Sequence, residues 1–294
     1  MLINIENEFL SLTVDTLGAQ VMSLKAGKTE YIWQGDPQYW RDRAPVLFPY
    51  VGRLWNNSYC YRGKTYTMGI HGFASKMDFT IAEQGKDFMV LSLTANEETR
   101  AMYPFEFTLD ISYRLVKNRV EISNTVRNHG QEVMPFGFGG HPGFRVPVEE
   151  GEAFEDYCLE FSAPCKPDRV GFSADVFLNG IDTPCPLEDD LRIWLRHDLF
   201  DTDAVVLKNM CREVTLKSKN GQNAVTVSYP GMGYIGFWHA YKRDAPYVCI
   251  EPWTSLPGRQ NVVEDLEYKS DLIHLQPGKI YENIWTITIE GNKK

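Results

Sequence analysis

Apolar and polar residues alternate along much of this chain, which is the pattern of half-buried antiparallel strands. The clearest run covers residues 105–115. Its apolar members, separated by polar residues, are Phe105, Phe107, Leu109, Ile111, Tyr113 and Leu115. After a turn at Lys117-Asn118 the alternation resumes and continues through Val126. The two runs together therefore predict a β-hairpin.

The same pattern predicts strands over most of the remaining chain. Strand pairs flank turns at residues 62–63 and 85–86. Further predicted strands cover residues 9–16, 19–25, 203–208, 212–219, 223–228, 234–239, 247–251 and 280–289. Helical signals are few. The segment Glu97–Tyr103 predicts a short helix that Pro104 ends, and residues 38–43 predict another short turn.

One segment, residues 145–190, is rich in Pro, Glu and Asp. Strands of the same character resume after it, so we interpret it as a loop-rich surface insertion and not as a domain boundary. A chain of 294 residues is long enough for two average domains or for one large β domain. We predict a single domain over residues 1–294, an all-β protein built as a large antiparallel β-sandwich with few short helices.

Composition narrows the class of partner. Aromatic residues make up 13% of the chain, which favours strands and leaves rings available to a ligand. A net charge of −9 argues against a nucleic-acid partner. No apolar run reaches membrane-spanning length, and Met1–Glu6 lacks the features of a secretory signal. The six cysteines are scattered without zinc-site spacing. We expect a cytoplasmic protein with reduced thiols and no membrane contact.

The segment Gly137–Phe144 places His141 among four glycines, two phenylalanines and Pro142. Glycines admit close approach to the backbone, and proline favours an extended conformation at the residue before it. Histidine is also the side chain whose pKa lies nearest neutrality. One interpretation is a proton-transfer group facing a small ligand. The other is a loop histidine that hydrogen-bonds its neighbours, and this segment alone leaves both open.

Two further segments also place one charged or titratable side chain among glycines and aromatic residues. Arg53 lies in an apolar, aromatic run. Its donors suit hydroxyls or a phosphate, and the structural alternative is that its stem packs on Trp55. His71 lies between Gly69 and Gly72. A lone histidine of this kind is more often a satisfied loop residue than a catalytic one.

The third segment is an apolar strand that we expect to end at Glu251, because Pro252 prevents the strand from continuing. A partly desolvated glutamate is a better base than an exposed one, because burial raises its pKa. A cap or an ion-pair partner is the structural alternative, and Trp253 offers a flat face to a sugar ring. The histidines lack metal-ligand spacing, and no phosphate loop or dinucleotide fingerprint is present. Acid–base chemistry without metal or cofactor is the remaining interpretation.

Taken together in this order, the segments resemble the aldose 1-epimerase (galactose mutarotase) family, and especially its LacX-like branch. The resemblance runs over nearly the whole chain, from residues 17–20 onward. Its motifs are Phe48–Asn57 with Gly63 and Tyr66, then Ile70–Phe73, Gly140–Phe144 and Cys249–Trp253. The resemblance implies the β-supersandwich of the galactose mutarotases, a large two-layer antiparallel fold.

The resemblance also implies roles for individual residues. The family's catalytic acid corresponds to His141 and its base to Glu251. Arg53 and His71 correspond to residues that hold the sugar, and Asp203 is the best match for a further acidic contact. Asp201, only two residues away, is the alternative. The implied partner is a small sugar, with no metal and no cofactor. The oligomeric state, monomer or homodimer, stays open.

Two departures from well-studied mutarotases concern the sugar-binding wall. The predicted base is followed by Pro252-Trp253 where they carry polar residues, and His71 lacks their preceding asparagine. The expected activity is interconversion of the α and β anomers of a hexose, and these departures leave the sugar itself open.

Two other functions stay open at this stage. One is a hexose-6-phosphate 1-epimerase, with Arg43, Arg259 or Lys242 as the phosphate clamp. The other is a carbohydrate-binding or sugar-sensing protein of the same fold without turnover.

Overall fold

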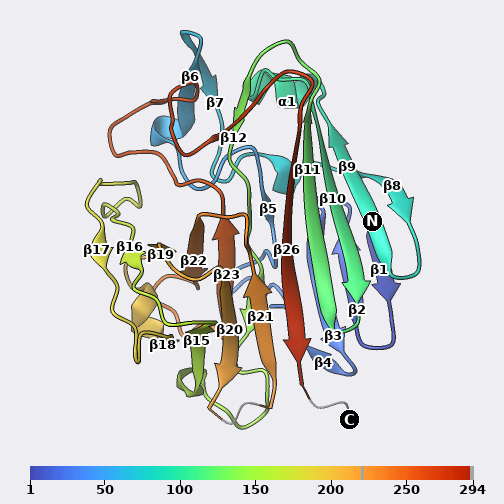
Figure 1. Ribbon diagram of the computed structural model, residues 1–294, viewed down its shortest axis with the longest axis vertical. Coiled ribbons are helices and arrows are strands. Elements are labelled where there is room, and N and C mark those ends of the chain that lie inside the picture. The colour runs from blue at the N-terminus through green and yellow to red at the C-terminus, as the bar shows by residue number, and fades with distance from the viewer. Residues whose placement is uncertain (220–221, 292–294) are drawn as a thin grey trace.

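The computed structural model describes residues 1–219 and 222–291 and is almost entirely β (Figure 1). Within these residues the structure contains one α-helix, α1 (Glu97–Met102). Four 3-10 helices accompany it: η1 (Trp55–Asn57), η2 (Ala74–Lys76), η3 (Phe154–Asp156) and η4 (His197–Phe200). The predicted all-β class with few short helices is confirmed. Among the described helices, none combines the length and hydropathy that crossing a membrane requires.

A nine-stranded antiparallel sheet forms one layer of the molecule. In spatial order it contains β18 (Arg192–Trp194), β15 (Tyr157–Phe161), β20 (Glu213–Ser218), β21 (Ala224–Ser228), β26 (Ile280–Glu290), β11 (Arg119–Asn128), β10 (Phe107–Val116), β9 (Phe88–Thr94) and β8 (Thr80–Gln84). At the end of the β10–β11 hairpin, Val116 pairs with Arg119 across the predicted turn, where Lys117 has a φ of 55°. The predicted hairpin is therefore present, with its first strand beginning at Phe107.

Two sheets form the opposing layer. The eight-stranded sheet runs through β17 (Thr183–Pro184), β16 (Asp168–Arg169), β19 (Val205–Lys208), β22 (Tyr234–Trp238), β23 (Tyr247–Trp253), β13 (Gly139–Gly140) and β5 (Val46–Leu47), and β14 (Gly143–Arg145) also pairs with β23. The four-stranded sheet contains β1 (Leu2–Glu6), β2 (Ser11–Asp15), β3 (Gln20–Ala26) and β4 (Thr29–Glu30). Shorter pairings join β12 (Met134–Phe136) to β25 (Ile273–Leu275), and β6 (Ser58–Tyr61) to β7 (Lys64–Thr67) and β24 (Glu264–Asp265).

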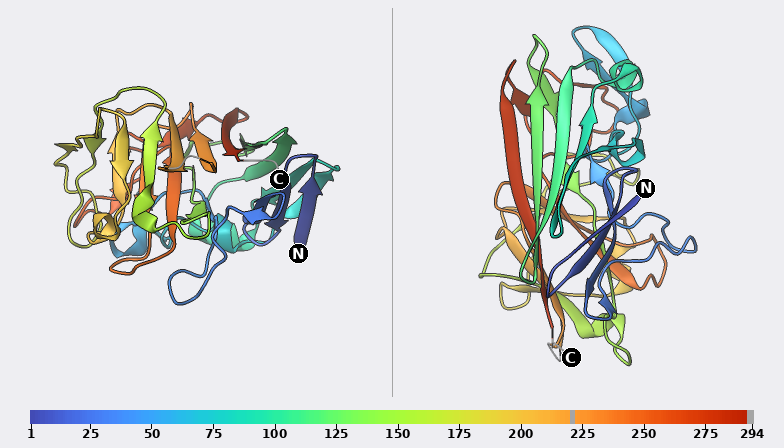
Figure 2. Two further views of the ribbon diagram at one scale, coloured as in Figure 1. Left: turned by 90° about the horizontal axis from the view of Figure 1, so that it is seen from below. Right: turned by 90° about the vertical axis from the view of Figure 1, so that its right-hand side faces the viewer.

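The core lies between these layers. Apolar residues from all three large sheets form one continuous buried cluster, to which β10 contributes Phe107, Leu109 and Ile111 at every second position. The right-hand view of Figure 2 shows the long strands β26, β11 and β10 on one side and the blue strands β1 and β2 on the other. Alternation in the sequence thus corresponds to one buried and one more exposed side of each strand.

The predicted helix after residue 96 is confirmed as α1. Asn96 caps it, since its side chain accepts the Thr99 N–H at 2.9 Å while the Thr99 hydroxyl accepts the Asn96 N–H at 2.9 Å. This reciprocal arrangement satisfies donors that the first helical turn leaves unpaired. The short turn predicted over residues 38–43 is present in part, as a turn over residues 37–39.

The prediction that residues 145–190 form only a surface insertion is wrong in part. Strand β15 lies within this range and belongs to the nine-stranded sheet, where it pairs with β20. Tyr157, Leu159 and Phe161 are buried in the main core. The prediction missed this short apolar strand because the residues around it are rich in proline. Its burial depends on pairing with residues distant in sequence.

The strand predicted to end at Glu251 also continues further, through Pro252 to Trp253. Two neighbouring N–H groups point to the same side of β23, because Ile250 donates to the Pro142 carbonyl at 3.1 Å and Thr254 donates to Phe138 at 2.8 Å. Pro252 lies midway between them, so its missing N–H removes a hydrogen bond on that side only. On the other side β23 keeps its pairing with β22.

Candidate active site

A cavity of about 350 Å³ opens on the face of the eight-stranded sheet that points away from the main core. Strand β23 defines the two faces, because Val248 and Ile250 belong to the main core while Cys249 and Trp253 lie in separate clusters. Glu251 lies on the same face of the strand as Cys249 and Trp253, and it lines the cavity. All five predicted site residues line it: Arg53, His71, His141, Asp203 and Glu251.

His141 and Glu251 face each other directly. His141 follows β13, whose Gly139 pairs with Trp253 of β23, and this pairing brings the two segments side by side. The distance from His141 Nε2 to Glu251 Oε2 is 3.2 Å, and their side chains are 10% and 2% exposed. The two atoms lie within hydrogen-bond reach, although Glu251 Oε2 accepts no well-directed hydrogen bond among the described residues.

The electrostatic surroundings of this pair favour its neutral form. Burial, and then the nearby His71, lower the pKa of His141 well below its ordinary value. Burial, and then the Asp203 carboxylate, raise the pKa of Glu251 well above its ordinary value. The two groups therefore hold two protons over a wide pH range, and the position of one of them decides which group acts as acid.

Two tryptophans enclose the histidine. The Trp40 ring centroid lies 5.0 Å from that of His141, and the Trp238 centroid lies 5.6 Å away in an edge-on arrangement. Both line the cavity, and neither was predicted. A signal for Trp238 was present, since it lies in the strand predicted over residues 234–239. Its register opposite Cys249, which puts it on the Glu251 face, became known only from the structure.

His71 has an unusual backbone and a defined tautomer. Its φ is 62°, its N–H donates to the Gly52 carbonyl at 2.9 Å, and its Nδ1 accepts the Gly52 N–H at 3.1 Å. Burial and then Arg53 lower its pKa to about 4, so the ring is neutral near pH 7. Because Nδ1 is an acceptor, Nε2 carries the proton. His71 is therefore a hydrogen-bond donor on the cavity wall.

Arg53 and Asp203 complete the polar lining. Within the described residues the Arg53 guanidinium has no protein hydrogen-bond partner, and its side chain is exposed toward the cavity. Asp203 has a φ of 78°, and its Oδ1 accepts the Ala204 N–H at 2.7 Å. Asp201 lines a neighbouring hollow but not this cavity, so position favours Asp203 as the acidic contact.

The glycines of the segment Gly137–Phe144 do not make room for a ligand. A Cβ on Gly139 would lie 2.7 Å from the Trp253 ring, and one on Gly140 would lie 2.7 Å from the Trp285 ring. These distances are too short for an ordinary contact, so the glycines admit tryptophan side chains of the protein itself. The space beside these two glycines is therefore filled by the protein itself.

The three cations considered as phosphate clamps lie elsewhere. Arg43 donates to the backbone of β3, Arg259 pairs with a carboxylate, and Lys242 packs over a tyrosine ring. None of them lines the cavity among the described residues. The cations that do line it are Arg53 and Lys76.

One group of possible metal ligands was not foreseen from spacing. Ligand atoms of His141, Cys249 and Glu251 all lie within 4.8 Å of one another. Burial, and then Glu251, raise the pKa of the Cys249 thiol well above its ordinary value, which favours the protonated thiol, a poor ligand. Because Cys249 and Glu251 are two residues apart on one strand, their proximity follows from strand geometry alone. We assign no metal to these residues.

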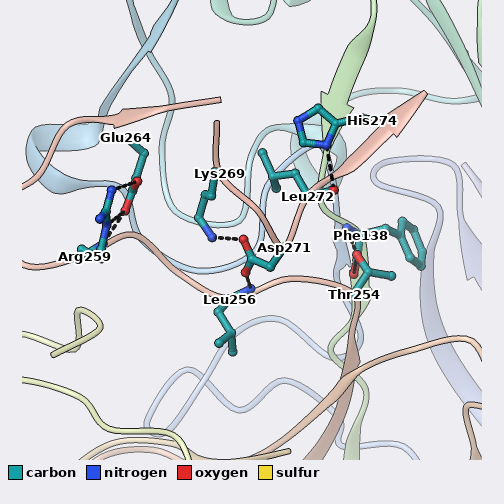
Figure 3. A network of polar contacts seen from close by, with 9 residues as sticks. All are labelled: Phe138, Thr254, Leu256, Arg259, Glu264, Lys269, Asp271, Leu272 and His274. Carbon is teal, nitrogen blue, oxygen red and sulfur yellow. Dashed lines mark hydrogen bonds and ion pairs between the residues drawn. The ribbon is translucent and has the colours of Figure 1, made fainter. Parts of the chain in front are cut away.

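A polar network supports the loop that follows β23 (Figure 3). The Phe138 N–H donates to Thr254 Oγ1 at 2.8 Å, and that hydroxyl donates to the Phe138 carbonyl at 3.0 Å. These bonds join the chain just before His141 to the chain just after Glu251. Further along, Asp271 accepts the Leu256 N–H at 2.6 Å. The network thereby holds the segments that carry the facing pair.

In the same network Arg259 binds Glu264 through two parallel bonds of 2.9 Å. Burial raises the pKa of the Glu264 carboxyl, but the hydrogen bonds and charge of Arg259 outweigh burial, so that pKa lies below its ordinary value. We expect Arg259→Leu to lower the free energy of unfolding by about 1–3 kcal/mol, because a carboxylate that is 3% exposed loses both guanidinium bonds and keeps only the backbone N–H of residue 259. Urea denaturation at neutral pH measures this loss.

The matched control is Arg100→Leu. Arg100 and Glu106 form a pair whose side chains are 45% and 49% exposed, so water screens their attraction and the expected loss is much smaller than for Arg259→Leu. A carboxyl with a lowered pKa stabilises the fold above its unfolded-state pKa, so the effect of Arg259→Leu should shrink as pH falls through the pKa of folded Glu264. Equal losses in the two variants would contradict this assignment.

Comparison with known proteins identifies the class. The family model for aldose 1-epimerase matches residues 1–286, and the chain belongs to the aldose 1-epimerase family. The chromosomal LacX protein of Lactococcus lactis subsp. lactis is 32% identical over 98% of this chain and 99% of its own length. The resemblance seen in the motifs is confirmed.

Solved structures agree with the fold. A galactose mutarotase related enzyme from Lactobacillus acidophilus has a TM-score of 0.95 at 36% identity, covering 99% of this chain and 98% of its own. A galactose mutarotase-like protein from Lactobacillus casei has a TM-score of 0.92 at 30% identity, covering 99% of this chain and 100% of its own. The two-layer galactose mutarotase-like fold is confirmed.

Proposed function

We propose that this protein interconverts the α and β anomers of a hexose by opening and closing the sugar ring. The observation that carries the proposal is the facing pair of His141 and Glu251, which lie 3.2 Å apart, are buried, and line a cavity together with the hydrogen-bonding groups of Arg53, His71 and Asp203. One acid and one base are what ring opening needs, without metal or cofactor.

The reaction starts when Glu251 takes the proton of the anomeric O1 hydroxyl. His141, in its protonated form, gives a proton to the ring oxygen O5, and the C1–O5 bond breaks to leave the free aldehyde. Rotation about C1–C2 presents the other face of the carbonyl. Closure of O5 on that face reverses both proton transfers and yields the other anomer. Proton count and charge are unchanged over the cycle.

Burial favours the neutral pair, whereas this mechanism uses the ion pair. The two forms contain the same protons and differ by one proton moving across 3.2 Å. A bound sugar brings hydroxyl dipoles to the pair, and charged forms gain more from such dipoles than neutral forms do. Arg53, His71 and Asp203 hold the sugar and so supply orientation. His71 acts as a donor through Nε2.

The test of the proposal is anomer exchange measured by NMR on the purified protein. The substrates are freshly dissolved α-D-glucose, α-D-galactose and glucose 6-phosphate. We expect faster exchange than in buffer for at least one neutral hexose. Binding without acceleration of any sugar would favour a carbohydrate-binding or sensing protein. Acceleration of glucose 6-phosphate alone would favour the phosphorylated substrate, with Arg53 and Lys76 as the cations at hand.

The pH dependence follows from the directions of the two pKa shifts. At low pH a third proton binds to the pair, which leaves no base. Because the pKa of His141 is lowered, this acid limb of the pH profile lies below pH 6.5. At high pH the pair loses its second proton, which leaves no acid. Because the pKa of Glu251 is raised, this alkaline limb of the pH profile lies well above pH 4.5. We therefore expect kcat/KM to have a bell-shaped pH profile that falls on both sides of an optimum.

A variant separates this explanation from ordinary pH inactivation. Because the Asp203 charge contributes to the raised pKa of Glu251, Asp203→Asn should move the alkaline limb to lower pH. Thr202→Val, next to it in sequence, is the control and should leave the limb in place. An alkaline limb at the same pH in all three proteins would contradict the assignment.

A further inference from the structure

The cavity continues into a second hollow. This hollow has a volume of about 900 Å³ and shares four lining residues with the cavity: Phe172, Val176, Asp203 and Ala204. A cavity of about 350 Å³ is at the lower end of the range for small-molecule sites, which suits a single pyranose ring. A monosaccharide would leave the second hollow unused.

The boundary between the two spaces has an uncommon backbone. Val176 lines both and has a φ of 63°. A β-branched residue rarely adopts a positive φ, because its side chain crowds the backbone there. Residues in such conformations concentrate at ligand-binding sites, where the surrounding structure holds them in place. Asp203 at the same boundary also has a positive φ, of 78°.

The second hollow has the surface that sugars bind. Tyr241 lines it and is 52% exposed, although Lys242 packs over its ring. Arg169 contributes a guanidinium whose Nη2 donates to Thr202 Oγ1 at 3.2 Å and which forms no ion pair within the described residues. Aromatic faces combined with planar polar groups match the apolar faces and the hydroxyls of a pyranose.

The charges favour a neutral ligand over a phosphate. Asp201 and Asp203 both line the hollow, and Arg169 is its one cationic lining residue among those described. A phosphate group would meet two carboxylates and one guanidinium, whereas a neutral sugar can accept from the arginine and donate to the carboxylates.

From these observations we propose that the second hollow is a subsite for a further glycosyl unit, so that the protein takes a reducing disaccharide with its reducing end in the cavity. The inference deepens the proposed function and rests on it for the identity of the sugar in the cavity. The second unit lies against Tyr241 and Arg169, and its linkage crosses the boundary at Val176 and Asp203.

The experiment compares binding of each disaccharide with that of its reducing-end monosaccharide, by NMR titration. The probes are maltose, cellobiose and isomaltose against glucose, and β-1,4-galactobiose against galactose. At least one disaccharide should bind about three- to tenfold more tightly than its monosaccharide. Tyr241→Ala and Arg169→Gln should each reduce that advantage while monosaccharide affinity is unchanged. Tyr268→Ala, at an 81% exposed tyrosine outside this hollow, is the matched control.

The outcomes separate the two proposals. No disaccharide advantage, or an advantage that persists in both variants, overturns the subsite. Tighter binding of glucose 6-phosphate that Arg169→Gln removes, without a disaccharide advantage, overturns it in favour of a phosphate site. Anomer exchange on the same samples tests the catalytic proposal independently. Tighter disaccharide binding without anomer exchange supports the subsite and contradicts turnover. Anomer exchange of monosaccharides without tighter disaccharide binding supports turnover and contradicts the subsite.

Discussion

Replacing Glu251 by glutamine is expected to slow anomer exchange by about 10²–10⁴-fold, because the variant loses the base that removes the O1 proton. His141→Asn should cause a loss of the same order, since it removes the acid for the ring oxygen. The double variant should exchange anomers only slightly more slowly than either single variant, because the acid and the base act together in the same step. NMR exchange at saturating sugar measures the rates.

These losses should occur without loss of stability. Glutamine has the shape of glutamate, and burial already opposes the charge of a side chain that is 2% exposed. Urea denaturation of Glu251→Gln should give a midpoint equal to or above that of the wild type. Glu282→Gln and His129→Asn, both at exposed positions outside the cavity, are the matched controls and should keep full activity. Full activity in Glu251→Gln or His141→Asn would remove that residue from its proposed role.

The largest effect on stability is expected from Phe48→Ala, with a loss of about 3–5 kcal/mol in the free energy of unfolding. Phe48 is fully buried, and four aromatic rings surround it. These rings belong to Phe73, Tyr103, Phe107 and Phe136, with centroids 5.3 to 6.3 Å away. Removing the central ring leaves a cavity that rigid neighbours cannot close. Urea denaturation measures the change.

The backbone of Phe48 also positions the turn that carries His71. The Phe48 carbonyl accepts the N–H groups of Phe73 and Ala74 at 3.0 and 3.1 Å, directly after the His71-Gly72 turn. Gly72 itself has a φ of +75°, and a Cβ there would lie 2.2 Å from the Phe48 carbonyl oxygen, so no other residue fits. The Tyr268→Ala variant is the exposed aromatic control, with an expected change within about 0.5 kcal/mol. A similarly small change in Phe48→Ala would contradict its central place in the core.

The sequence also contained more of the site than its separate motifs suggested, because strand periodicity relates positions two residues apart. Cys249 and Glu251 share one face of β23, and Gly139 and His141 have the same parity across from them. Which face points into the core was not predictable locally, since every residue of β23 is buried. The structure decides this by packing Val248 and Ile250 against the nine-stranded sheet.

The sequence alone predicted the β class, the principal hairpin, helix α1 and four residues that line the cavity, namely Arg53, His71, His141 and Glu251, and it left Asp203 and Asp201 as alternatives. These depend on local periodicity, capping and family motifs, which the chain carries within a few residues of each position. Tertiary structure alone decided that Trp40 and Trp238 enclose His141, that Asp203 and not Asp201 faces the cavity, and that tryptophans fill the space beside the glycines. Such contacts join segments 40 to 100 or more residues apart, and only the register between their strands fixes which side chains meet.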